Sequence, residues 1–135
     1  MSYPIKDIEG IGDVYAGKLK AVGISTTGTL LKRGKTPSGR KELESSTGIG
    51  HALILEWVNL ADLMRIKGVG EEYSDLLEEA GVDTVNELKN RNAKNLYEKV
   101  KETNAAKNLV RRLPSLKEIT NWIDQAKSLP PMVEY

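Results

Sequence analysis

Cysteine and phenylalanine are absent from this 135-residue chain, and histidine occurs once, at position 51. Without cysteine, neither a disulfide nor a thiolate metal site can form, which fits a reducing compartment. Without phenylalanine, the core must consist mainly of Leu, Ile, Val and Ala, and this composition favours helices. His51 has no second ligand or nucleophile partner close to it in the sequence, so we expect no metal site and no cofactor.

Long apolar runs are also missing, because no segment approaches the roughly 20 residues that a membrane helix needs. The N-terminal residues contain no apolar signal core, so nothing indicates export. These absences predict a cytoplasmic protein without a membrane partner. Its length predicts one domain, or two small units that share a core.

The chain has no large excess of charge of either sign, and its net charge of +1 provides no global attraction to nucleic acid. The distribution of charge is uneven, however. Seven acids and no base lie between positions 71 and 87: Glu71, Glu72, Asp75, Glu78, Glu79, Asp83 and Glu87. Five bases and no acid lie between positions 32 and 41: Lys32, Arg33, Lys35, Arg40 and Lys41. A solvated surface is the default interpretation of both runs, and binding is the alternative.

An internal repeat is the strongest pattern that is present. Segments 5–32 and 63–90 share eight identities at a constant offset of 58, and Gly10 and Gly12 correspond to Gly68 and Gly70. Such self-similarity indicates two related structural units. We place the boundary near residues 60–62, which gives a half with the basic loop, 1–60, and a half with the acidic helix, 61–135.

Helix signals recur along the chain and strand signals are missing, so we expect an all-α fold. Helical spacing of apolar residues follows Gly12, and Gly23 is placed to end that helix. Thr36 before Pro37 predicts an N-cap for a helix over residues 37–47, and another helix is expected over 51–60. Asn92 is expected to cap a helix over 93–103. Ser115 begins a capping box for the last helix.

Three short turns carry the chemical signal: the first glycine turn (residues 10–12), the middle glycine turn (48–50) and the last glycine turn (68–70). Two glycines allow the backbone to turn within a few residues, and the apolar residue between them is expected to pack between helices. The first N–H groups of the following helix are then unpaired and carry partial positive charge. They can hold a phosphate without reading any base.

These residues resemble the helix-hairpin-helix motif of DNA repair, recombination and replication proteins. The first copy has Ile8, the glycine turn, Ala16, Leu19 and Gly23-Ile24, and the second copy has Ile66, the glycine turn, Ser74, Leu77 and Gly81-Val82. Nearly the whole chain further resembles an uncharacterised bacterial family of unknown function, for which tandem helix-hairpin-helix architecture is expected. The phrases at residues 56–70 and 109–116 carry this second resemblance, which implies no known activity.

The two copies differ in what they can bind. Asp13 follows the first turn and opposes a phosphate, but Lys18 and Lys20 lie on the next helix. Glu71 and Glu72 follow the last turn, where like charge makes a phosphate improbable. For each turn, the alternative is that it serves only to pack two helices together.

The leading hypothesis is sequence-independent, non-catalytic binding of a DNA or RNA backbone by the first half. The expected contacts are Gly10, Ile11, Gly12, Lys18, Lys20, Lys32, Arg33, Lys35, Arg40, Lys41, Gly48 and Gly50. The alternative is a protein-interaction adaptor that offers its acidic 71–87 face to a basic protein surface. No nucleophile–base set or metal-ligand cluster emerges, and we expect no enzyme.

Overall fold

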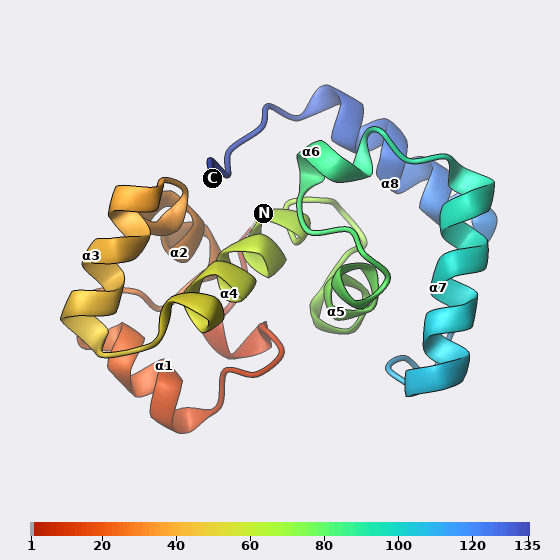
Figure 1. Ribbon diagram of the computed structural model, residues 1–135. Helices are drawn as coiled ribbons and strands as arrows, with labels where there is room; N and C mark the ends of the chain where they lie inside the picture. The colour runs from red at the N-terminus through yellow and green to blue at the C-terminus, as the bar shows by residue number, and fades with distance from the viewer. Residues whose placement is uncertain (1) are drawn as a thin grey trace.

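A computed structural model describes residues 2–135, and the fold of this part is all-helical, as the sequence predicts. It contains no strand, although Pro4 and Thr26 form an isolated bridge. No helix among these residues is long and apolar enough to cross a membrane. The elements are η1 (Ile5–Asp7), α1 (Asp13–Lys20), α2 (Thr27–Gly34), α3 (Pro37–Thr47), α4 (His51–Leu63), α5 (Glu71–Glu79), α6 (Val85–Leu88), α7 (Ala93–Lys107) and α8 (Leu116–Ser128) (Figure 1).

Side-chain caps explain where several helices begin. The hydroxyl of Thr36 accepts a hydrogen bond from the backbone N–H of Gly39 before α3. Asn92 accepts one from Asn95 before α7. Ser115 and Glu118 form a complete capping box before α8. These bonds satisfy N–H groups that have no partner within the helix, and they confirm the predicted helix starts.

The end of α7 differs from the expected position. The sequence predicts a helix over 93–103, but α7 continues to Lys107. Asn108 then adopts the left-handed conformation at φ 51°, and the side chain of Asn104 accepts hydrogen bonds from the N–H groups of Leu109 and Val110. Asparagine tolerates this conformation better than most residues, so it ends the helix where no glycine is available.

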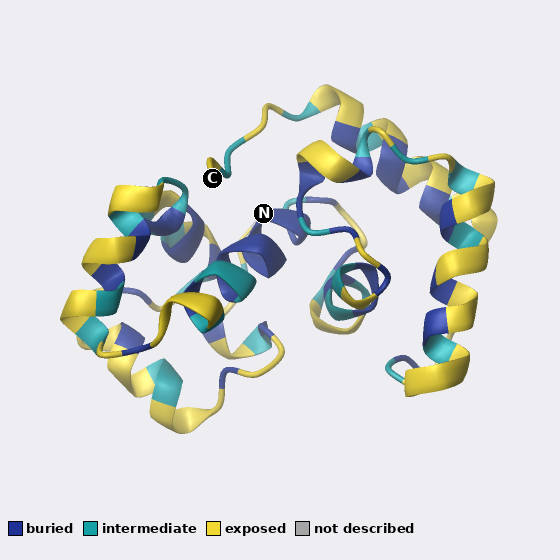
Figure 2. Ribbon diagram, in the orientation of Figure 1, coloured by how far each residue is buried: buried dark blue, intermediate teal, exposed yellow. Residues whose placement is uncertain are grey.

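Two groups of buried side chains form the core. The N-terminal cluster takes its buried residues from positions 5–64, and the C-terminal cluster takes them from positions 63–126. Helix α4 contributes to both, because Leu60 packs in the N-terminal cluster and Leu63 in the C-terminal cluster. The boundary expected at residues 60–62 therefore lies inside a continuous helix. Figure 1 shows α4 between the group α1–α3 and α5, and Figure 2 shows how much of α4 is buried.

The last residues of the chain return to the N-terminal cluster. After α8, Met132 and Val133 pack against that cluster, although α8 itself belongs to the C-terminal cluster. Figure 1 shows this segment crossing from α8 to the vicinity of α2 and α3. We call residues 130–135 the C-terminal strap. It connects two parts of the core that are otherwise joined through α4.

Candidate nucleic-acid interface

Each of the three glycine turns contains one glycine at positive φ. The values are 95° at Gly10, 74° at Gly48 and 98° at Gly68. The apolar residues between the glycines, Ile11, Ile49 and Val69, are all buried. The expectation that they pack between helices is confirmed. The turns therefore have a packing role, and any ligand must be held by the helix that follows.

A tryptophan packs beneath the first and last glycine turns. Trp57 of α4 contacts Tyr15 of α1 with ring centroids 5.0 Å apart, and Trp122 of α8 contacts Tyr73 of α5 at 5.2 Å. Both tryptophans are at most 2% exposed. Both therefore belong to the core, and neither is available to stack on a nucleic-acid base.

The three helices that follow the turns differ at their N-termini. The first turn of α1 holds Asp13, and that of α5 holds Glu71 and Glu72. The first turn of α4 contains no acidic residue, and Gly50 provides no side chain to cap it. His51 and Ala52, which begin α4, are exposed. Of the three helices, only α4 has no acidic residue in its own first turn, although the Glu44 carboxylate of α3 lies 3.2 Å from Nδ1 of His51 at the same N-terminus.

Acidic residues surround the first glycine turn. Asp13 is paired with Lys6, and the hydrogen bond and positive charge of that lysine lower the pKa of Asp13. Burial raises the pKa of Glu71, and the charges of Glu9 and Asp7 raise it further. This concentration of carboxylates next to residues 10–12 disfavours a phosphate there.

The predicted basic residues occupy two separate places. Lys18 and Lys20, in the last turn of α1, are exposed, and the Lys18 ammonium lies 5.9 Å from the Tyr15 ring centroid. The second group lies around the connection between α2 and α3. In Figure 1 this connection is at the opposite end of the N-terminal group from α1. One small ligand cannot contact both places, whereas an extended polyanion can.

The basic cluster of residues 32–41 is only partly on the surface. Lys32 and Lys41 are exposed, Lys35 is half-buried, and Arg33 donates a hydrogen bond of 3.0 Å to the carbonyl of Val22. Arg40, which the sequence places among the phosphate contacts, does not lie on the surface. This side chain is 2% exposed and donates to two backbone carbonyls. Arg40 turns inward because the C-terminal strap covers it.

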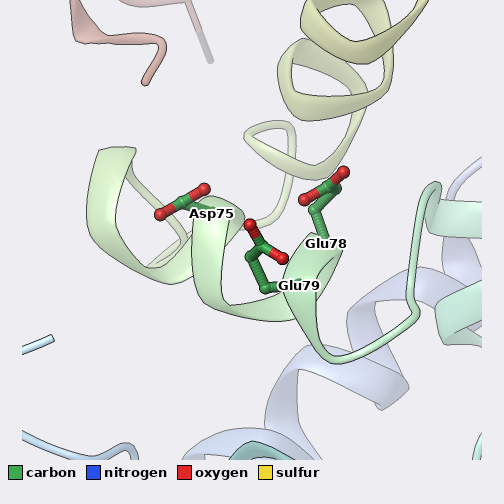
Figure 3. A group of neighbouring side chains, drawn as sticks. All are labelled: Asp75, Glu78 and Glu79. Atoms are coloured by element: carbon green, nitrogen blue, oxygen red, sulfur yellow. The ribbon is translucent and has the colours of Figure 1, made fainter. Parts of the chain in front are cut away.

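The acidic run also divides on folding. Asp75, Glu78 and Glu79 of α5 lie close together, with one carboxylate oxygen from each within 4.8 Å of the others (Figure 3). Only Glu79 has a cationic partner in the described chain, Lys107 at 2.6 Å. Burial, reinforced by neighbouring carboxylates, raises the pKa of Asp75 to about 6 and that of Glu78 to about 7. The group can accept a cation, whether a basic side chain or a hard metal ion.

Carboxylates from other elements contribute to this environment. Glu56 of α4 raises the pKa of both Asp75 and Glu78, and Glu9 raises that of Asp75. Glu87 at the end of the acidic run instead accepts a hydrogen bond from the N–H of Asp83. The acidic 71–87 face is therefore not one uniform solvated surface. Its centre lies against residues of the N-terminal half.

Sequence reasoning missed two polar contacts in the core. Asp62 is 1% exposed, accepts a hydrogen bond of 2.8 Å from the N–H of Val85 and pairs with Arg65 at 2.8 Å. Asn59 is buried and accepts a hydrogen bond from the Tyr135 hydroxyl at 3.0 Å. The polar residues Asn59 and Asp62, inside the otherwise apolar helix α4, were the available signal. Their partners lie 76 and 23 positions away.

An open cleft of about 690 Å³ lies at the N-terminus of α5, between Gly70, Glu9 and the segment that contains Leu109 and Arg112. Glu9, Glu71 and Glu72 line it together with Arg111 and Arg112. Arg112 is already paired with Glu118 through two hydrogen bonds, and its guanidinium carbon lies 5.9 Å from the centroid of the Tyr73 ring. With its mixed charge, this cleft is not suited to a polyanion.

The family model described as "Domain of unknown function (DUF4332)" matches residues 9–129, and the chain belongs to this family. A search of curated proteins found no match, and a search of solved structures found none either.

Proposed function

We propose that this protein is a non-catalytic module that binds the phosphate backbone of nucleic acid without reading its sequence, through the N-terminus of α4. The observation that carries this proposal is the difference among the three helices that follow glycine turns. Only α4 combines an uncapped N-terminus with a first turn free of acidic residues. A 13-residue helix such as α4 presents both unpaired N–H groups and the positive end of its dipole to an anion.

The cations of α1 extend the proposed contact. Lys18 and Lys20 are exposed, and no carboxylate of the described chain forms an ion pair with either. Lysine side chains on a surface bind phosphates as point charges and release counterions from the nucleic acid. Lys32 and Lys41 supply further positive charge at the other end of α3. The affinity then depends on the backbone charge of the ligand and very little on its bases.

We interpret the architecture as two helix-hairpin-helix halves in tandem. Support comes from the equivalent features of the two halves: a positive-φ glycine before α1 and α5, a buried apolar residue after it, and a tyrosine packed on a tryptophan. In this interpretation the first half binds the ligand and the second half is mainly structural. The glycine turns position helices, and no residue is assigned a catalytic role.

Titration of a fluorescent DNA duplex and a single strand, at low and moderate salt, tests the proposal. Backbone binding predicts that several unrelated sequences bind with similar affinity and that the affinity falls steeply as salt increases. A variant with Lys18 and Lys20 changed to Gln is expected to bind more weakly and with a smaller salt dependence. A variant of the distant exposed residues Lys94 and Lys101 in α7, changed in the same way, is the matched control. Absence of binding at low salt would refute the proposal.

A second candidate is a protein-interaction adaptor that binds a basic protein surface. The observation that favours it is the group formed by Asp75, Glu78 and Glu79, in which two of the three carboxylates lack a cationic partner in the described chain. Burial and, after it, repulsion between carboxylates raise the pKa values of Asp75 and Glu78, and a guanidinium or ammonium group from a partner would offset both effects. Binding of a labelled polyarginine peptide that is lost in a Glu78→Gln, Glu79→Gln variant would support this candidate.

A further inference from the structure

The C-terminal strap is held on the N-terminal half by contacts along its length. Arg65 donates a hydrogen bond of 2.9 Å to the carbonyl of Pro130, where the strap begins. The N–H of Glu134 donates to the carbonyl of Lys35 at 2.8 Å. The Tyr135 hydroxyl donates to Asn59 at 3.0 Å, and Met132 and Val133 pack on the N-terminal cluster. The strap therefore occupies a defined position on the N-terminal half.

Beneath the strap lies Arg40, a buried cation without an anionic partner. Its Nη1 donates to the carbonyl of Gly34 at 2.9 Å, and its Nη2 donates to the carbonyl of Glu134 at 2.6 Å. The guanidinium carbon lies 6.0 Å from the centroid of the Tyr135 ring. Its Nε is buried and has no hydrogen-bond partner among residues 2–135. No carboxylate of this part of the chain forms an ion pair with Arg40.

This arrangement is unusual for a buried arginine. Removal of a guanidinium from water is unfavourable unless an anion and a full set of hydrogen bonds replace the water. Here neutral carbonyl oxygens replace it, and the Nε atom has no acceptor. A phosphate would supply both a negative charge and enough acceptor oxygens to engage two guanidinium donors at once. The residues around Arg40 thus satisfy it less well than a phosphate would.

The surroundings of Arg40 also favour an anion. Arg40 lies in the first turns of α3, whose N-terminus begins at Pro37 and has no acidic residue in its first turn. Lys35 precedes this helix and Lys41 follows Arg40 directly. The strap occupies one of the Arg40 donors through the carbonyl of Glu134. When the strap moves away, that donor becomes free.

We infer that the C-terminal strap masks a phosphate-binding site centred on Arg40, and that phosphate binding and strap docking exclude each other. This site goes beyond the proposed function, because it lies at the α2–α3 connection and not at the N-terminus of α4. Only molecules with an open strap can bind phosphate at this site. The apparent affinity is therefore the intrinsic affinity multiplied by the fraction of molecules in which the strap is open. If the strap is closed in about nine-tenths of the molecules, opening it raises the affinity about tenfold.

Inorganic pyrophosphate is the first probe, used with the full chain at constant ionic strength. The Nε–H resonance of Arg40 reports on the site, and the exchange rate of the Glu134 amide reports on the strap. Pyrophosphate is expected to shift the Arg40 resonance and to accelerate exchange of the Glu134 amide. A V133S/Y135A variant, which loosens the strap without changing the charge, is expected to bind pyrophosphate about tenfold more tightly. An S128A variant at the exposed end of α8 is the control.

Substitution of Arg40 distinguishes an anion site from a purely structural arginine. In the loosened variant, R40Q is expected to abolish pyrophosphate binding, whereas R40K retains part of it. A pyrophosphate-induced shift of the Arg40 resonance in the loosened chain, together with loss of pyrophosphate binding in R40Q, supports the inference. Pyrophosphate binding that persists in R40Q, or an equal affinity in the natural and loosened chains, would overturn it. A complete lack of binding in the loosened chain, with its fold intact by circular dichroism, would overturn it as well.

A DNA duplex as the second probe identifies the source of the phosphate. If the loosened chain binds duplex more tightly and R40Q removes the gain, a nucleic-acid backbone occupies the site. If only pyrophosphate binding responds to Arg40, the ligand is a free phosphate or a small phosphate ester. Both results support a masked phosphate site. These results do not depend on the N-terminus of α4. If substitution of Lys18 and Lys20 leaves duplex binding unchanged, that result contradicts the proposed function alone.

Discussion

The Cβ atom that an alanine would add at Gly10 lies 3.3 Å from Nε1 of Trp57, the buried tryptophan of α4. The same relationship exists between Gly68 and Trp122, at 3.2 Å. Both glycines also have a positive φ, which other residues adopt only with strain. The close fit of a glycine on a tryptophan therefore fixes how each turn lies on the core.

Replacement of Gly10 by alanine is expected to destabilise the protein by about 1–3 kcal/mol, because the side chain would both strain the backbone and press on Trp57. Urea unfolding followed by tryptophan fluorescence measures this change in free energy. Gly12→Ala is the matched control, since Gly12 has a φ of −93° and no heavy atom within 4 Å of an added Cβ. Equal stability of the two variants would contradict the assigned role of Gly10.

The glycine turns and helix caps could be predicted from the sequence because they are local. Gly48 ends α3. Thr36 caps the start of the same helix by accepting a hydrogen bond from the N–H of Gly39, only three positions later. Arg40 could not be placed in this way. Its neighbours in the sequence resemble a solvated basic loop, and its burial depends on Glu134, 94 positions later. Asp62 poses the same difficulty, since its partner Val85 lies 23 positions away and is reached only when α4 and α6 pack together.

Removal of the Asp62 carboxylate is expected to be among the most damaging single changes. Asp62→Ala would leave the Val85 N–H and the Arg65 guanidinium without their partner in a nearly buried position. Loss of one member of a buried ion pair destabilises proteins by about 3–5 kcal/mol. Chemical denaturation measures the loss, with the exposed Asp124→Ala in α8 as the control. A change below about 1 kcal/mol would indicate that water replaces the carboxylate.

The stability of the protein is expected to fall as the pH rises from about 5 to 8. Asp75 and Glu78 have pKa values of about 6 and 7 in the folded state, above the ordinary values of 3.8 and 4.5. The folded state therefore binds more protons than the unfolded state in this range, and deprotonation favours unfolding. The groups that repel these carboxylates are Glu9, Glu56, Glu79 and Asp83, while Lys107 attracts them.

Glu78→Gln tests this origin of the pH dependence, because the amide cannot ionise. The variant is expected to melt at a higher temperature than the natural protein at pH 8 and to show a smaller change between pH 5 and 8. Glu72→Gln, at an exposed position on the same helix, is the control. Measurements below pH 4 are unsuitable. There Glu118, whose pKa is lowered to about 2 chiefly by its hydrogen bond with Arg112, loses its stabilising contribution.

An acidic residue at position 52 is expected to separate helix stability from ligand binding. Ala52 is exposed in the first turn of α4, where a negative charge stabilises a helix by about 0.3–1 kcal/mol through its dipole. The same charge repels a phosphate at the N-terminus. Ala52→Glu should therefore unfold at the same or a higher urea concentration while its affinity for a DNA duplex falls about tenfold, which corresponds to about 1.4 kcal/mol.

The control for this variant is Ala105→Glu in α7, which adds the same charge at an exposed position in the other half of the chain. Both variants have the same net charge, so a difference between them measures the position of the ligand and not a general repulsion of DNA. An equal loss of affinity would place the phosphate elsewhere on the surface. A loss confined to Ala52→Glu, with its stability retained, would locate a phosphate at the amide groups that begin α4.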